Sequence, residues 1–356
     1  MPDHTTEKTA LDGLIRPSDR ILITGANGFI GLKVLENLLQ RGLRNVRCFI
    51  RSSRNADQLQ KIAAAFKADL HFYHGNLLSQ ADCSKATKDV TLIYHLAVGP
   101  GGKSFPNAFM NTVIPTRNLL TAGCAHNTLK RFVNVSSFAV YSNQHKPRLR
   151  WMDESCPLDE HPERRGDAYA YAKLHQDRLV ADYCRRSQVE YVIVRPGAVY
   201  GPGKKSITGR VGIDTFGIFM HLGGSNQVPF TYVDNCAEAI VLAGLVPGID
   251  QEIFNIVDDD LPTSRRFLTL YKKRVHPVRS IYFPHALSYF LCFLWEKYAQ
   301  LSEGQLPPVF SRAEWHAYWK KTRYSNEKIK KKLGWTMKVS TAEGLDRYLT
   351  SCRNGD

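Results

Sequence analysis

The sequence has no long hydrophobic run and no closely spaced pair of cysteines. No stretch reaches the 18 apolar residues of a transmembrane helix, and the nearest, residues 286–295, is too short to span a bilayer. The eight cysteines stand singly, without a C-x-x-C pair or histidines at a metal-binding spacing. We therefore expect no metal site and a reducing compartment. The first twenty residues are polar, so we expect no signal peptide and a cytoplasmic location.

Composition excludes several further classes of chain. The 356 residues are 43% hydrophobic, which argues against disorder, collagen and a disulfide-framed miniprotein. The net charge is +15, and residues 261–356 hold 18 Lys+Arg against 7 Asp+Glu. Such a region would suit nucleic acid, an anionic membrane surface or a phosphorylated ligand. Because it contains no nucleic-acid recognition motif, we expect no nucleic-acid partner, and its peripheral contact with an anionic membrane is a hypothesis.

The first 200 residues alternate between short apolar runs and helical patterns, which predicts an α/β fold. We expect a Rossmann-type doubly wound parallel sheet with a smaller, mostly helical C-terminal substrate-binding region. The expected division is a tail at 1–19, a first domain at 20–203 and the substrate-binding region at 204–356, with 230–258 returning to the first domain. Strands are expected at 20–24, 46–50, 70–73, 92–97, 132–135, 190–194, 230–233 and 253–257, and helices at 29–41, 56–66, 109–125, 169–184 and 237–245.

Glycines occupy the junction between the first expected strand and the first expected helix. Gly25, Gly28 and Gly31 form a G-x-x-G-x-x-G pattern there. The pyrophosphate of a dinucleotide needs a backbone without Cβ atoms in its way, and the free N–H groups of a helix N-terminus favour it. The pattern therefore predicts that residues 20–203 form an NAD(P)-binding Rossmann domain.

The end of the second strand indicates which dinucleotide binds. An acidic residue there would accept a hydrogen bond from the ribose 2′-hydroxyl of NAD. Instead the strand is followed by Arg51-Ser52-Ser53-Arg54, with no acidic residue before Asp57. A guanidinium and two hydroxyls suit the 2′-phosphate of NADP, so we favour NADP(H) and keep NAD(H) as the alternative.

Serine, tyrosine and lysine stand where proton transfer would need them. Ser136 and Ser137 close the fifth expected strand, and Tyr169 and Lys173 lie one turn apart on one face of the following helix. A free tyrosine has a pKa of about 10, which a neighbouring ammonium and a nicotinium ring would lower. We expect Tyr169 to exchange a proton with a substrate oxygen that a serine hydroxyl holds. Tyr171 has the wrong spacing to share a helix face with Lys173.

These residues resemble the motifs of the extended short-chain dehydrogenases/reductases, over about residues 20–348. The resemblance implies that the catalytic residues are Ser137, Tyr169 and Lys173, with Lys173 also holding the nicotinamide ribose. It further implies a homodimer formed through the helices 109–125 and 169–184. The matching segments are the phosphate loop at 24–31, the ribose strand at 94–97, the serine motif at 135–141 and the nicotinamide loop at 194–202. The cofactor-binding residues it implies, together with Arg51, are Gly25, Asn27, Gly28, Phe29, Ile30, Gly31, Asn76, Leu77, Leu96, Ala97, Val98, Val135, Tyr169, Lys173, Pro196, Gly197 and Val199.

Three departures from the family pattern bear on function. Asn76 stands where an aspartate normally meets the adenine, and Pro115 stands where a helix glycine is common. Phe138 and Ala139 replace the Asp-Glu pair of nucleotide-sugar dehydratases. The last replacement excludes dehydration by that route.

The second half resembles the 3β-hydroxysteroid and sterol-carboxylate dehydrogenases, chiefly over residues 223–235. Val228 stands where nucleotide-sugar epimerases usually place an arginine for substrate phosphates. The likeness implies an NAD(P)-dependent oxidoreductase that interconverts a secondary alcohol and a ketone on a mostly apolar, steroid-like or other hydrophobic small molecule. Residues that could form an apolar pocket, unless they simply pack the C-terminal region, are Phe283, Leu287, Phe290, Leu291, Leu294 and Trp295.

Two other functions stay open. A nucleotide-sugar epimerase or reductase would use the spare positive charge, with Lys204, Lys205 and Arg210 as candidates to bind a diphosphate. The second alternative is a non-catalytic NADP-binding sensor. Such relatives typically lose the tyrosine or the lysine, whereas this chain keeps both Tyr169 and Lys173.

Overall fold

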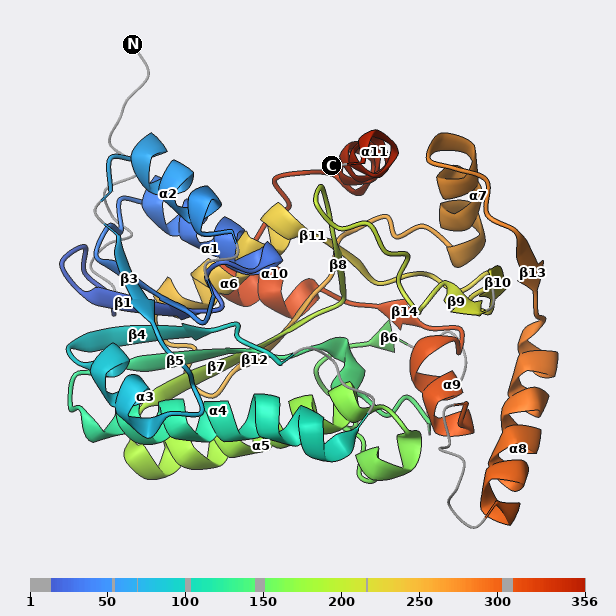
Figure 1. Cartoon of the computed structure of the whole chain (residues 1–356), viewed down its shortest axis with the longest axis horizontal. Coiled ribbons are helices and arrows are strands. Elements are labelled where there is room, and N and C mark those ends of the chain that lie inside the picture. Colours follow the sequence, from blue (N-terminus) through green and yellow to red (C-terminus); the bar gives the residue numbers. More distant parts are fainter. Residues whose placement is uncertain are drawn as a thin grey trace.

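A seven-stranded parallel sheet forms the centre of the computed structural model, in the order β12-β7-β5-β4-β1-β2-β3 (Figure 1). The structure describes residues 14–52, 55–68, 70–99, 104–144, 151–215, 217–302 and 310–355. The strands of this sheet are β1 (Arg20–Thr24), β2 (Val46–Ile50), β3 (His71–His74), β4 (Val90–His95), β5 (Arg131–Val135), β7 (Glu190–Pro196) and β12 (Ile253–Ile256).

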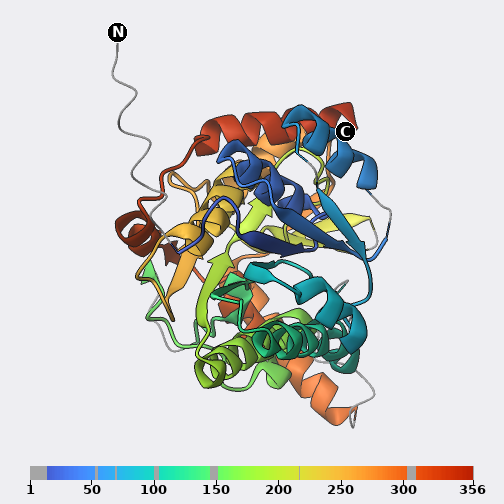
Figure 2. The same ribbon diagram turned by 90° about the vertical axis from the view of Figure 1, so that its left-hand side faces the viewer.

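Helices cover both faces of the sheet, and the two helical layers lie on opposite sides of it in both views (Figures 1 and 2). One layer contains α1 (Phe29–Gln40), α2 (Ala56–Ala65), α6 (Val233–Leu245) and α10 (Glu327–Leu333). The other contains α3 (Gln80–Thr87), α4 (Phe105–Ala125) and α5 (Ala168–Ser187). The predicted Rossmann-type, doubly wound α/β fold is therefore confirmed.

The predicted elements mostly match the observed ones, because buried parallel strands are continuously apolar. Two differences have local causes. α4 begins four residues earlier than expected, after Ser104, with a proline in its first turn that needs no N–H partner. α3 was not expected because its faces differ little in polarity, but the side chain of Ser79 caps it by accepting from the Asp82 N–H at 3.2 Å.

Beyond the sheet, the C-terminal region combines helices with three small sheets. α11 packs against α7 and β11, and α8 packs against α9 (Figure 1). The small sheets pair β8 (Ala198–Tyr200) with β11 (Phe230–Tyr232), β6 (Trp151–Met152) with β14 (Arg323–Tyr324), and β10 (Ile218–His221) with β9 (Gly212–Thr215) and β13 (Ser280–Tyr282). The remaining helices are α7 (Ser264–Arg274), α8 (His285–Leu301), α9 (Arg312–Tyr318) and α11 (Thr341–Asn354), with short 3₁₀ turns at Phe138–Val140 and Pro162–Arg165.

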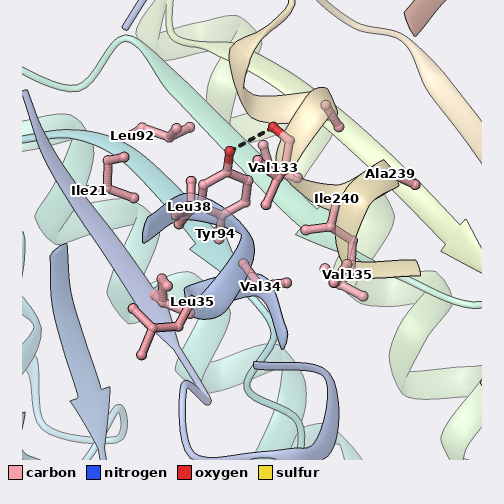
Figure 3. Packing of buried hydrophobic residues seen from close by; sticks show 14 of the residues in the cluster. Ile21, Val34, Leu35, Leu38, Leu92, Tyr94, Val133, Val135, Ala239 and Ile240 are labelled. Carbon is pink, nitrogen blue, oxygen red and sulfur yellow. Dashed lines mark hydrogen bonds between the residues drawn. The ribbon is translucent and has the colours of Figure 1, made fainter. Parts of the chain in front are cut away.

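Tyr94 lies at the centre of the main core, where residues of β1, β4, β5, α1 and α6 meet (Figure 3). Its side chain is fully buried, and its hydroxyl donates to the Val241 carbonyl of α6 at 2.9 Å. A Cβ at Gly244 would lie 2.1 Å from the Tyr94 hydroxyl. The lack of a side chain at Gly244 therefore lets α6 approach the sheet.

Within the part of the chain that the structure describes, every helix is too short or too polar to span a bilayer.

Candidate active site

A cavity of about 1500 Å³ opens at the carboxyl end of the sheet, where β1, β2, β4, β5 and β7 end. Doubly wound sheets bind their ligands at this edge. Of the residues that the sequence predicts for catalysis or cofactor binding, all line this cavity except Lys173 and Pro196. Both of these are buried. The chain thus brings the predicted residues together in one place.

The glycine loop is shaped by close backbone contacts. Gly25 has a φ of +72°, and a Cβ at Gly31 would lie 2.1 Å from the Gly25 carbonyl oxygen. α1 begins directly after this loop, and its N-cap residue, Gly28, makes no side-chain cap. The first N–H groups of α1 are therefore available to an anion. This arrangement fits the pyrophosphate of a dinucleotide.

Arg51 follows β2 directly, lines the cavity and is exposed. The loop that follows β2 is tied to the glycine loop, because the Asn27 side chain donates to the Ser52 carbonyl at 3.2 Å and the Asn55 side chain donates to the Asn27 carbonyl at 3.0 Å. No acidic side chain pairs with Arg51 among the described residues. Ser53 and Arg54, the other residues expected near a 2′-phosphate, lie outside the described residues.

Asn76 and Leu77 line the part of the cavity next to β3. The Asn76 side-chain oxygen accepts from the Leu78 N–H at 3.0 Å, and the Asn76 N–H donates to Asp82 at 2.8 Å. Asn76 is exposed, so its side-chain amide can still reach a ligand. Although asparagine replaces the usual aspartate, these two hydrogen bonds still hold the turn at this position.

Tyr169 lies in the first turn of α5, with Ser137 near its hydroxyl. Burial raises the pKa of Tyr169 to about 12, although the nearby Ser137 hydroxyl lowers it, and the carboxylates of Asp167 and Asp177 raise it further. Lys173 is not among the groups that shift this pKa. That Lys173 and a nicotinium ring together lower this pKa stays a prediction for the enzyme with its cofactor bound.

The ammonium of Lys173 is 2% exposed and makes two short hydrogen bonds. It donates to the Val135 carbonyl at 2.7 Å and to the Gln176 side-chain oxygen at 2.8 Å. Burial lowers the pKa of Lys173 to about 8, and the Asp177 carboxylate opposes this shift. Because an ammonium has three N–H groups, one remains for a ligand that enters beside Val135.

The orientation of Gln176 follows from the hydrogen bonds of its neighbour Thr116. The Thr116 hydroxyl donates to the Thr112 carbonyl at 2.7 Å, so it accepts from its two other partners. These are the Gln176 side-chain nitrogen and the His95 Nε2, each at 2.8 Å. Gln176 therefore presents its oxygen to Lys173.

His95 continues this chain of hydrogen bonds to β1. Burial, and to a lesser degree Lys173, lowers the pKa of His95 to about 3, so the ring is neutral and carries its proton on Nε2. The Thr24 hydroxyl then donates to His95 Nδ1 at 2.7 Å and accepts from the Ala97 N–H at 3.2 Å. A continuous set of hydrogen bonds thus joins the strand before the glycine loop to Lys173.

One part of the cavity wall is aromatic. Phe230, Phe267, Tyr200 and Tyr348 line it, and their rings contact one another at centroid distances of 4.7–6.3 Å. None of the apolar candidates between Phe283 and Trp295 lines this cavity, so of the two possibilities that the sequence left open, lining this pocket is not observed. Of those candidates, Leu287, Phe290, Leu291 and Leu294 are exposed on the outside of α8, whose buried face is formed by Ser288, Cys292 and Ala299.

Several site residues were not predicted from the sequence. Gln176 and Thr116 carry no recognisable signal, because a glutamine or threonine within a helix usually faces solvent or caps a turn. Arg210 and Tyr318 line the cavity from the C-terminal half. Arg210 is the exception, because the sequence already made it a candidate to bind a diphosphate. A signal for Tyr318 could have come only from its place among the aromatic residues that follow α8.

A family model for the NAD dependent epimerase/dehydratase family matches residues 21–256, which include the glycine loop, Ser137, Tyr169 and Lys173. The chain belongs to this family. Its members of the extended short-chain dehydrogenase/reductase type are NAD(P)-dependent enzymes, and this chain is one of them.

Full-length relatives have different substrates in their names. The chain is 24% identical to the decarboxylating sterol-4-alpha-carboxylate 3-dehydrogenase of Mus musculus, covering 96% of this chain and 93% of the relative. It is 26% identical to the 2-alkyl-3-oxoalkanoate reductase of Stenotrophomonas maltophilia, with 93% and 99% covered. The solved UDP-glucuronic acid 4-epimerase of Bacillus cereus in complex with NAD has a TM-score of 0.69 at 21% identity, with 94% and 99% covered. This last likeness concerns the fold.

The burial of Lys173 predicts a pH-dependent stability. Because its pKa is about 8 in the folded protein and 10.5 ordinarily, the unfolded chain binds more protons between these values, and stability rises with pH across this window. Relative to Lys173→Met, the wild-type protein should gain about 2 kcal/mol of unfolding free energy between pH 7 and about pH 9.5 in urea titrations. Lys205→Met, at an exposed position, is the control: because it keeps Lys173, the wild-type protein should show no such gain relative to it. A gain of the same size in both comparisons would contradict the assignment to Lys173.

Proposed function

We propose that this enzyme interconverts a secondary alcohol and a ketone on a mostly apolar small molecule, by hydride transfer to or from a nicotinamide. The observation that supports this most directly is that Ser137 and Tyr169 lie near each other in the wall of the cavity that the glycine loop also lines. When bound, the cofactor supplies or accepts the hydride. Tyr169 exchanges the accompanying proton with the substrate oxygen, and Ser137 holds the same oxygen by a hydrogen bond.

Lys173 has two roles in this proposal. Its remaining N–H can hold the nicotinamide ribose beside Val135, while its positive charge favours ionisation of Tyr169 once the ammonium turns toward the ligand. A phenol with a pKa of about 12 is a weak acid at neutral pH, so this assistance is needed. The hydrogen bonds through Gln176 keep the ammonium in position until then.

The aromatic face of the cavity supports a mostly apolar substrate, in line with the sterol-carboxylate and oxoalkanoate names of two full-length relatives. Val228, which stands in place of a phosphate-binding arginine, is 1% exposed and has no charge to offer a phosphate.

The second candidate function is that of a nucleotide-sugar epimerase. A further relative favours it, the UDP-glucose 4-epimerase of Vibrio cholerae. This relative is 25% identical to the chain, and the match covers 67% of this chain and 70% of the relative. Net oxidation of the reduced cofactor by a ketone separates the two, because epimerases regenerate their cofactor.

We also propose a homodimer formed through α4 and α5, a cytoplasmic location and peripheral contact with an anionic membrane. The outer face of α8 supports the last of these, since Leu287, Phe290, Leu294, Tyr298 and Leu301 are 45–81% exposed along one side of the helix. Light scattering tests the dimer, and co-sedimentation with anionic vesicles at physiological salt tests the membrane contact. A monomer in the first measurement or no pelleting in the second would rule out the respective proposal.

Tyr169→Phe removes the proton donor while keeping the ring, so turnover should fall by about 10²–10⁴-fold. Affinity for the cofactor should stay within about twofold, since the hydroxyl faces the substrate oxygen. Tyr171→Phe is the matched control: Tyr171 lies on the same helix but packs edge-on against Phe105, and its loss of a hydroxyl should leave turnover unchanged. Survival of turnover in Tyr169→Phe, measured by cofactor absorbance with a ketone panel, would exclude Tyr169 as the donor.

NADP(H) is the proposed cofactor, and Arg51 is the residue proposed to contact its 2′-phosphate. Arg51→Asp should weaken NADPH binding by about 10–100-fold through loss of a charge-assisted hydrogen bond, and should improve NADH relative to NADPH. Fluorescence titration with both cofactors measures this. An unchanged ratio of the two affinities would place the 2′-phosphate contact elsewhere.

A further inference from the structure

Arg210 is a buried cation in the wall of the cavity that holds Ser137 and Tyr169. It lies just before β9 and is 6% exposed. A buried guanidinium is costly unless it is paired. No carboxylate forms an ion pair with it among the described residues, and its hydrogen-bond and ring partners there are neutral. The unpaired charge therefore needs an explanation.

The contacts of Arg210 orient it without neutralising it. Its Nη1 donates to the Ala317 carbonyl at 3.1 Å, and its guanidinium carbon lies 4.9 Å from the centre of the Tyr318 ring. The Tyr318 hydroxyl donates to Asp167 at 2.8 Å, and Asp167 caps α5 two residues before Tyr169. Arg210 is thus separated from the start of the helix that carries Tyr169 by one aromatic ring.

The acidic groups near the corner of the cavity formed by Arg210 and Tyr318 do not balance the positive charge of Arg210. Asp167 is shared with a second buried arginine, Arg165, whose Nη2 lies 3.5 Å from the Asp167 carboxylate. Burial raises the pKa of Glu314 to about 8, so this side chain is mostly neutral at pH 7. The corner therefore keeps an excess positive charge.

The whole cavity has the same imbalance. Among the described residues that line it, one is acidic and five are basic: Asp234 against Lys33, Arg51, Lys204, Arg210 and Arg347. Lys33 is paired with Glu36 and Asp234, and Arg347 is paired with Glu343. A dinucleotide pyrophosphate at the glycine loop would be neutralised by the helix terminus and the cations at that end, which leaves Arg210 without an anion.

The structure also separates Arg210 from the two lysines considered with it. Lys204 and Lys205 are exposed, and their ammonium groups donate to the carbonyls of Val199 and Gly355. Neither occupies the buried corner beside Tyr318. A diphosphate site built from all three residues is therefore not supported, whereas a single anionic group on Arg210 is.

We propose that the substrate carries an anionic group, a carboxylate or a phosphate, that binds Arg210 while its carbonyl or hydroxyl lies between Ser137 and Tyr169. This inference rests on the proposed function and adds the substrate class: an amphipathic molecule with an apolar body along the Phe267 and Tyr348 side of the cavity and one anionic end. A guanidinium fixed by a ring and a carbonyl is preorganised for such a group.

Binding to the enzyme saturated with NADP⁺ tests this independently of turnover. The probes are decanoate, decyl phosphate and methyl decanoate, which share an alkyl chain and differ in charge. Isothermal titration should give the better anion about 10–100-fold tighter binding than the neutral ester. Tighter binding of decyl phosphate than of decanoate would identify a phosphate as the natural group, and the reverse would identify a carboxylate.

Arg210→Met should abolish this preference while the affinity for methyl decanoate and for NADP⁺ stays within about twofold. Arg265→Met is the matched control, because Arg265 also stacks on a tyrosine, at 5.1 Å from the Tyr282 ring, but lies outside the cavity. Equal binding of acid and ester to the wild-type protein, or a preference that persists in Arg210→Met, would overturn the inference. The comparison of acid and ester on the wild-type protein tests the inference even where Arg210→Met does not fold. Absence of ketone reduction, with the preference for the anion intact, would overturn only the proposed reaction.

Discussion

The carboxylate of Asp177 fixes the helix on which the proposed chemistry depends. It accepts hydrogen bonds from Asn134, Ser136 and Arg195 at 2.9–3.2 Å, which ties α5 to β5 and β7. One face of α5 carries Tyr169, Lys173 and Asp177, because these residues are spaced four positions apart. Because the Asp177–Arg195 pair is almost fully buried, loss of either partner would leave an uncompensated charge. The register of α5 against the carboxyl edge of the sheet therefore rests on this pair.

Much of the fold and part of the site could be predicted from local chemistry. The glycine loop is recognisable because a Cβ at Gly31 would collide with the backbone, and only glycine avoids this. Gln176, Thr116 and His95 could not be found in this way, since they come from a helix, another helix and a strand and meet only through the strand order. Whether the apolar residues of α8 line the pocket stayed open in the sequence, because an apolar helix does not reveal which of its faces the rest of the chain covers; none of them lines the cavity.

The positive charge of the chain now has two distinct parts. Most of it lies on the surface of the C-terminal region, where it is solvated or paired, as between Lys332 and Glu252. A smaller part lies inside the cavity, and there the burial of Arg210 gives it greater weight than any exposed lysine, because water screens it less. A net charge counted along the sequence cannot make this distinction, since it does not show which charges share a cavity with Tyr169.

The central claim is that Tyr169 ionises near neutral pH only when NADP⁺ adds its positive charge beside Lys173. The ionisation of Tyr169 can be followed by ultraviolet difference spectroscopy, with the Tyr169→Phe protein subtracted, in the free protein and with saturating NADP⁺. The account predicts a pKa of about 12 in the free protein and a much lower value, nearer neutral pH, in the complex. The same pKa in both states would contradict it.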